Sequence, residues 1–171
     1  MATVSTTTYN STTDTTALTI TLASLPTSST LLVGRESTAI SNASDLYIDA
    51  LVSGQITTGT SPTAGQIEVY VYGYVKNVSS TPTYPNPVSG SDAAITLVAE
   101  TKQRLYLADA ITTNATSNTA YGIRPFGIAQ FFGGIMPIRW GIVVVHNTAV
   151  NLNATAGNHY LHYQGIKYTS T

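Results

Sequence analysis

The segment FFGGIMPIRWGIVVVHN, residues 131–147, contains the strongest folding signal in this 171-residue chain. Its run IVVV, residues 142–145, is the longest unbroken block of β-branched side chains in the sequence. Such side chains fit a pleated, half-buried sheet better than a helix, so residues 139–146 are predicted to form a central strand. The glycine pair 133–134 and Pro137 predict a turn before it, because glycine tolerates unusual φ values and proline cannot donate to an interior ladder.

Short apolar stretches bounded by Gly, Pro, Ser, Thr and Asn predict further strands along the rest of the chain. They cover residues 17–22, 31–33, 46–53, 66–76, 94–98, 105–111, 121–132 and 159–168, with a short additional strand at Val150. The composition of residues 93–110 also suits a helix, but the alternation that follows Leu105 favours two strands. About eight or nine strands with little helix predict an all-β fold, an antiparallel β-sandwich of jelly-roll type.

Residues 1–16 are polar, rich in threonine and weakly patterned. Such a segment buries too little apolar surface to offset the entropy lost on ordering. We therefore predict a flexible N-terminal arm over residues 1–16 and one jelly-roll-like domain over residues 17–171. Two alternatives are open for the arm: a disordered tail, or a segment that becomes ordered on the surface of a partner.

The predicted strand over residues 66–76 has two different faces. Its aliphatic side chains alternate with a second set that comprises Glu68, Tyr70, Tyr72, Tyr74 and Lys76. The aliphatic face is predicted to belong to the core. The three tyrosines are the candidate partner interface, and the alternative is that they pack beneath a neighbouring loop. Glu68 is predicted to be a solvated charge that discourages pairing between sheet edges.

Charged residues make up only 9% of the chain, and the net charge is −1. An ordinary globular domain has about 25% charged residues. The seven Lys and Arg are scattered, which argues against nucleic-acid binding and against electrostatic docking to a membrane. The N-terminal residues lack a basic region followed by an apolar stretch, so we expect no secretory signal. We expect the protein to be synthesised in a cytoplasm. The chain has no Cys, which excludes disulfides and thiolate chemistry.

The sequence offers no set of residues typical of catalysis, and we expect no enzyme activity, cofactor or metal. His159 and His162 have the spacing of a ligand pair, but on a strand these side chains point to opposite faces. Asp45 and Asp49 lie roughly 13 Å apart on a strand, too far to act as a pair of carboxylates. None of the common nucleophile or nucleotide-binding motifs is present.

Three blocks of the sequence resemble virion proteins of tailed bacteriophages, and specifically the jelly-roll capsid decoration (cement) proteins. They are LYIDALVSGQITTGTSPTAGQIEVYVYGY at residues 46–74, PFGIAQFFGGIMPIRWGIVVVHN at 125–147 and AGNHYLHYQGIKY at 156–168. With Arg35-Glu36-Ser37, the blocks cover most of residues 31–168. The resemblance is to a structural family, so it carries no catalytic residues over to this chain.

The resemblance implies a non-enzymatic protein on the outside of an assembled capsid. Its expected partners are the major capsid protein and other copies of the same chain, as a homotrimer that bridges neighbouring capsid subunits. The alternative is a carbohydrate-binding β-sandwich of a phage tail or fibre, an adhesin in which exposed tyrosines or Trp140 stack on sugar rings.

Overall fold

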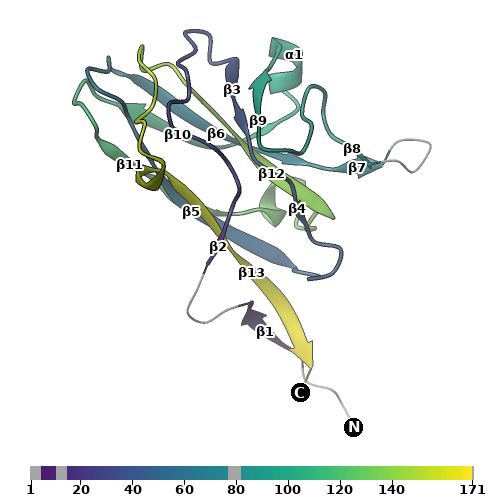
Figure 1. Cartoon of the computed structure of the whole chain (residues 1–171). Coiled ribbons are helices and arrows are strands. Elements are labelled where there is room, and N and C mark those ends of the chain that lie inside the picture. Colours follow the sequence, from purple (N-terminus) through teal and green to yellow (C-terminus); the bar gives the residue numbers. More distant parts are fainter. Residues whose placement is uncertain (1–4, 11–14, 77–81, 171) are drawn as a thin grey trace.

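The computed structural model of the chain describes residues 5–10, 15–76 and 82–170, and it contains two antiparallel sheets packed face to face (Figure 1). The β13 sheet consists of β1 (Ser5–Tyr9), β2 (Thr16–Ala17), β13 (Tyr160–Ser170), β5 (Asp49–Thr57) and β11 (Ala120–Gly127). The β12 sheet consists of β10 (Tyr106–Thr113), β6 (Gly65–Gly73), β12 (Arg139–His146), β3 (Val33–Glu36), β4 (Ile40–Ser41) and β9 (Ala93–Thr96). The short strands β7 (Val75–Lys76) and β8 (Pro82–Thr83) pair with each other. The predicted all-β sandwich is confirmed.

The strand order is that of a jelly roll. Eight strands define it when numbered 1 to 8 in chain order: β2, β3, β5, β6, β10, β11, β12 and β13. One sheet then has the order 1-8-3-6 and the other 2-7-4-5. This interleaving of two Greek keys is the jelly-roll arrangement, in which long connections cross between the sheets.

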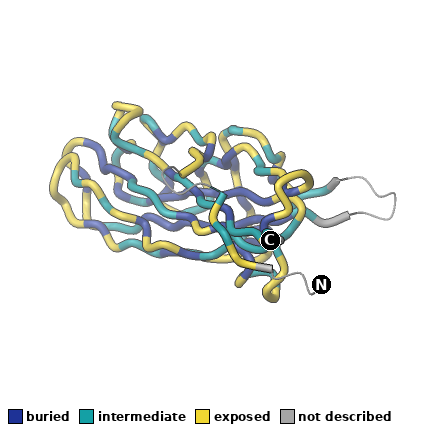
Figure 2. The backbone as a smooth tube through the Cα atoms, turned by 90° about the horizontal axis from the view of Figure 1, so that it is seen from below, coloured by how far each residue is buried: buried dark blue, intermediate teal, exposed yellow. Residues whose placement is uncertain are grey.

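β12 is the central strand of its sheet, as predicted from its β-branched run. It pairs with β6 on one side and with β3 and β4 on the other. Trp140, Ile142 and Val144 point into the main core between the two sheets, whereas Val143 and Val145 point to the outer face. The predicted turn before the strand is also present, because Gly133 and Gly134 have φ values of 69° and 82°. Exposed residues concentrate in the turns at the ends of the sandwich (Figure 2).

A second core covers the outer face of the β12 sheet. Residues 82–105, which lie between β6 and β10 in the chain, contribute Val88, Ile95, Leu97 and Leu105 to this core. The segment includes α1 (Ala99–Lys102), so a helix over all of residues 93–110 is excluded and the preferred pair of strands is confirmed as β9 and β10. Because of this cover, β6 and β12 are buried on both faces.

Several predicted strands have different bounds in the structure. Of residues 17–22, only Ala17 belongs to a strand, although Leu18 and Leu22 are buried in the main core. The strands predicted to begin at Leu31 and Leu46 begin at Val33 and Asp49, because both leucines adopt left-handed backbone conformations, with φ values of 56° and 53°. β11 ends at Gly127, and a 3-10 turn (Ala129–Phe132) follows it. Val150 lies in a bend and not in a strand.

Part of the predicted N-terminal arm lies along β13. Residues 5–9 form β1, antiparallel to β13 with Tyr9 opposite Ile166, and Thr16 forms β2 with Ala17. Residues 1–4 and 11–14 lie outside the described residues. In the described ranges, no helix has the length and apolar character needed to cross a membrane.

Candidate interaction surface

The outer face of the β13 sheet carries a row of large side chains. Along β13, Leu161 and Tyr163 point into the main core, so the positions that alternate with them point outward. The outward row consists of Tyr160, His162, Gln164, Ile166 and Tyr168. The strand register places Leu51 of β5 opposite Gln164 and Tyr9 of β1 opposite Ile166, so both join the row. We refer to these seven residues as the β13 face.

Apolar groups on the β13 face are accessible to solvent. Tyr168 is 63% exposed, Tyr9 55%, Tyr160 47% and Leu51 39%. Tyrosine is enriched in protein interfaces because it combines a large apolar ring with a hydroxyl that tolerates water. Residues 82–105 cover much of the outer face of the β12 sheet, although Leu107 on that face is exposed. The two sheets therefore differ in what they present to a partner.

The β13 face continues onto a two-stranded ribbon. β5 pairs with β13 only as far as Ile166, and beyond that point β13 pairs with β1. Figure 1 shows this β1–β13 ribbon extending from the body of the sandwich toward both chain termini. An isolated two-stranded ribbon is marginally stable in water. A partner that covers one face of the ribbon would stabilise it.

The three tyrosines predicted as the partner interface lie in the second core or against it. Tyr70 is 6% exposed and Tyr72 is fully buried, where its hydroxyl donates to the Ser37 carbonyl oxygen at 2.7 Å. Tyr74 is partly buried, with its ring centroid 6.1 Å from that of Tyr84. The alternative of packing beneath a neighbouring segment is therefore what the structure shows for Tyr70 and Tyr72. Neither ring is available as a stacking platform, and nor is Trp140, which is buried in the main core.

Glu68 is not the solvated charge predicted from the sequence. Its carboxylate is buried beside the second core and accepts hydrogen bonds from Lys102 Nζ at 2.7 Å and from the Tyr70 hydroxyl at 2.8 Å. Lys102 also lies 5.3 Å from the centre of the Tyr70 ring. Burial and the hydrogen bond to Glu68 raise the pKa of Tyr70 above its ordinary value. The ion pair thus anchors α1 to β6, which is a structural role.

The histidines do not form a ligand cluster. His159 donates from Nε2 to the Asn153 carbonyl oxygen at 2.8 Å, and burial lowers its pKa below the ordinary value. His162 lies on the β13 face, with Nδ1 2.7 Å from the Thr15 hydroxyl. Across the residues that the structure describes, no three His, Asp or Glu side chains come together as a metal site.

Comparisons of the chain with protein-family models, curated proteins and solved structures find no match. The jelly-roll topology, the β13 face and the resemblance to phage virion proteins are therefore the features of this chain that bear on its function.

Proposed function

We propose that this protein is a non-enzymatic structural protein of a tailed-phage virion, a decoration protein that binds the outside of the assembled capsid and bridges major capsid subunits. The observation that carries the proposal is the β13 face, an accessible surface of tyrosine and aliphatic side chains on a rigid jelly roll. The sequence resemblance supports the same class of protein.

The chemistry of the β13 face suits a large, uncharged contact. A stable interface buries about 800 Å² on each partner and is depleted of charged residues at its centre. None of the seven residues of the face is an Asp, Glu, Lys or Arg. The adjacent Asp49, opposite Ile166, is partly buried, and its Oδ1 accepts hydrogen bonds from the backbone N–H groups of Ala50 and Ala129. Arg124, which is exposed nearby on β11, is held by Asp109 through a contact of 2.6 Å. Attachment through this face should therefore depend only weakly on salt.

The β1–β13 ribbon extends the β13 face beyond the sandwich. A decoration protein stabilises a capsid because it binds the assembled lattice and not the free subunits, which shifts the equilibrium toward the lattice by mass action. A ribbon that projects from the sandwich can contact a second capsid subunit while the sandwich contacts the first. In a homotrimer, three such contacts would act together and raise the apparent affinity.

Co-sedimentation with capsids tests the proposal. The purified chain is mixed with expanded capsids that lack it and with unexpanded precursor particles, and bound protein is quantified after centrifugation. We expect saturable binding to the expanded capsid and little binding to the precursor. Absence of binding to both particles would contradict the proposal.

The adhesin alternative, in which a sugar stacks on Tyr70, Tyr72 or Trp140, is not proposed. All three rings are buried. A carbohydrate site on this chain would therefore use none of these three rings.

A further inference from the structure

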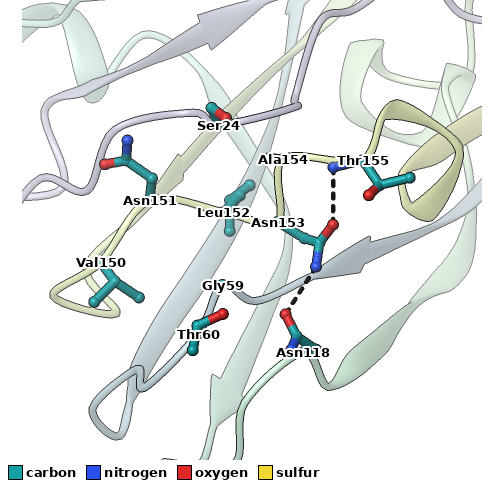
Figure 3. A pocket seen from close by; sticks show the side chains of 10 residues that line it. All are labelled: Ser24, Gly59, Thr60, Asn118, Val150, Asn151, Leu152, Asn153, Ala154 and Thr155. Carbon is teal, nitrogen blue, oxygen red and sulfur yellow. Dashed lines mark hydrogen bonds between the residues drawn. The ribbon is translucent and has the colours of Figure 1, made fainter.

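A polar cleft of about 400 Å³ lies at the end of the sandwich where four connections converge (Figure 3). These are the connections β2–β3, β5–β6, β10–β11 and β12–β13. The lining residues are Ser24, Gly59, Thr60, Asn118, Val150, Asn151, Leu152, Asn153, Ala154 and Thr155. β13 begins beside this end at Tyr160 and finishes in the ribbon, so the cleft and the ribbon lie roughly 30 Å apart. The cleft therefore lies at the Tyr160 end of the β13 face, far from the ribbon at the other end, and shares no residue with that face.

The backbone around the cleft is held in conformations that side chains disfavour. Ser24 and Asn118 in its wall have φ values of 56° and 53°, and Ser61 and Ala149 beside it have 55° and 65°. Non-glycine residues persist in this region only where the surrounding structure fixes them, and such residues cluster at binding sites. At Gly59, a Cβ atom would lie 2.1 Å from the Asn151 carbonyl oxygen, so two of the connections touch through their backbones.

The side chain of Asn153 organises the floor of the cleft. Its Nδ2 donates to Asn118 Oδ1 at 2.8 Å, and its Oδ1 accepts from the Thr155 backbone N–H at 2.9 Å and from Asn158 Nδ2 at 3.0 Å. Its backbone N–H donates to the Thr57 carbonyl oxygen at 3.1 Å. Figure 3 shows this amide between Asn118 and the Thr155 backbone. A site fixed in advance in this way loses little entropy when a ligand binds.

Other polar groups of the cleft are available to a ligand. The side chains of Thr60, Asn151 and Thr155 are exposed and make no hydrogen bond to the part of the chain that the structure describes. A side-chain amide presents a donor and an acceptor next to each other, which matches two neighbouring hydroxyl groups. Val150 supplies an apolar contact for C–H groups. No lining residue is ionisable, so the cleft has no charge to offset the free-energy cost of removing a charged ligand from water.

We infer that this cleft binds a neutral saccharide, whose hydroxyls are hydrogen-bonded by Thr60, Asn118, Asn151 and Thr155. The site differs from the tyrosine platform expected for an adhesin because it recognises hydroxyl groups through amides and not ring faces through aromatics. A shallow, polar cleft gives weak binding to a single sugar, with a Kd on the order of 1 mM. Several copies displayed on one particle would bind a polysaccharide far more tightly.

Heteronuclear NMR titration of the full chain tests the inference. The probes are glucose, galactose, mannose and N-acetylglucosamine, with glucuronate as the charged counterpart. We expect at least one neutral sugar to shift amide resonances in all four connections, and glucuronate to bind more weakly. No shift with any neutral sugar, shifts confined to another surface, or tighter binding of glucuronate would overturn the inference.

Three variants locate the site. Asn151→Ala removes one amide, and Asn118→Gly removes another while keeping the left-handed backbone that glycine accepts without strain. Asn151→Ala is expected to weaken sugar binding about 5-fold, the effect of one lost hydrogen bond, and Asn118→Gly by at least as much, because it also removes the acceptor of Asn153 Nδ2. Thr96→Ala on β9 is the control and should bind the sugar like the parent chain. Equal sugar binding by all variants would overturn the inference. Capsid binding by Asn151→Ala should match that of the parent chain, because Asn151 lies outside the β13 face, so the two assays test the cleft and the proposed function separately.

Discussion

Asp109 of β10 and Arg124 of β11 join the two sheets at one edge of the sandwich. Asp109 Oδ1 accepts from Arg124 Nη2 at 2.6 Å and from Nε at 2.9 Å, while Oδ2 accepts from the Arg124 backbone N–H at 3.0 Å. Both residues lie where the strand register shifts, between Leu107 and Asp109 in β10 and between Ile123 and Phe126 in β11. The two bulges thus turn these residues toward each other across the sheet edges.

Replacing Asp109 by alanine should destabilise the fold. The carboxylate is buried, and its loss leaves the Arg124 backbone N–H without this acceptor where the edges of the two sheets meet. We expect Asp109→Ala to lower the free energy of unfolding by about 1–3 kcal/mol, measured by urea denaturation. Glu100→Gln, at an exposed position in α1, is the control. An unchanged urea midpoint for Asp109→Ala would show that the bridge contributes nothing to stability.

The central strand could be predicted because its signal is local. The β-branched run at residues 142–145 specifies a strand by itself, and the glycine pair 133–134 marks the turn before it. The alternation of residues 66–76 likewise identified β6 and its aliphatic core face.

Whether the opposite face of β6 is exposed or covered could not be predicted, because the covering segment is distant in the sequence. Alternation shows that Tyr70 and Tyr72 share a face but not what covers it. The cover comes from residues 82–105, and Lys102 of α1 turns Glu68 into a buried ion-pair partner. The β13 face was missed for a related reason: its members come from β1, β5 and β13, and only the strand register brings them together.

Stability should fall as the pH decreases from 7 to 5. Burial lowers the pKa of His146 and of His159 below 6.5, so both are neutral in the folded chain at neutral pH. An unfolded chain binds protons at these histidines from about pH 6.5 downward, which favours unfolding. The stabilisation is therefore complete above pH 6.5 and is lost as the pH falls toward the folded-state pKa values.

Thermal denaturation at several pH values, compared between the parent chain, His159→Gln and the control His162→Gln, measures this effect. We expect the pH dependence between 7 and 5 to be smaller in His159→Gln and retained in His162→Gln. Although burial favours the neutral form of Asp92, hydrogen bonds from Arg35 and Thr21 lower its pKa, so this carboxyl titrates below the range tested. A profile identical in all three proteins would exclude His159 as a contributor.

Two exposed leucines provide a matched test of the β13 face. Leu51 lies on this face and is 39% exposed, whereas Leu107 on β10 is 49% exposed and lies outside it. We expect Leu51→Ser to weaken capsid binding about 5-fold to 30-fold, as for a contact worth 1–2 kcal/mol, and Leu107→Ser to leave it unchanged. Equal capsid affinities of the two variants in the co-sedimentation assay would show that the capsid contact lies outside the β13 face.

Deleting residues 2–10 tests the ribbon. Removal of β1 takes away the strand that pairs with the end of β13, while the described side chains of β1 are mostly exposed and outside both cores. We therefore expect weaker capsid attachment with a melting temperature close to that of the parent chain. Attachment as strong as that of the parent chain would remove the ribbon from the proposed interface.

Electron cryo-microscopy of the virion in which we propose this chain to reside tests the central proposal most directly. The account predicts density for the jelly roll on the outside of the capsid, with the β13 face and the β1–β13 ribbon against neighbouring major capsid subunits. Density for the chain in the tail alone, or on the capsid with the side formed by residues 82–105 toward the lattice, would contradict it.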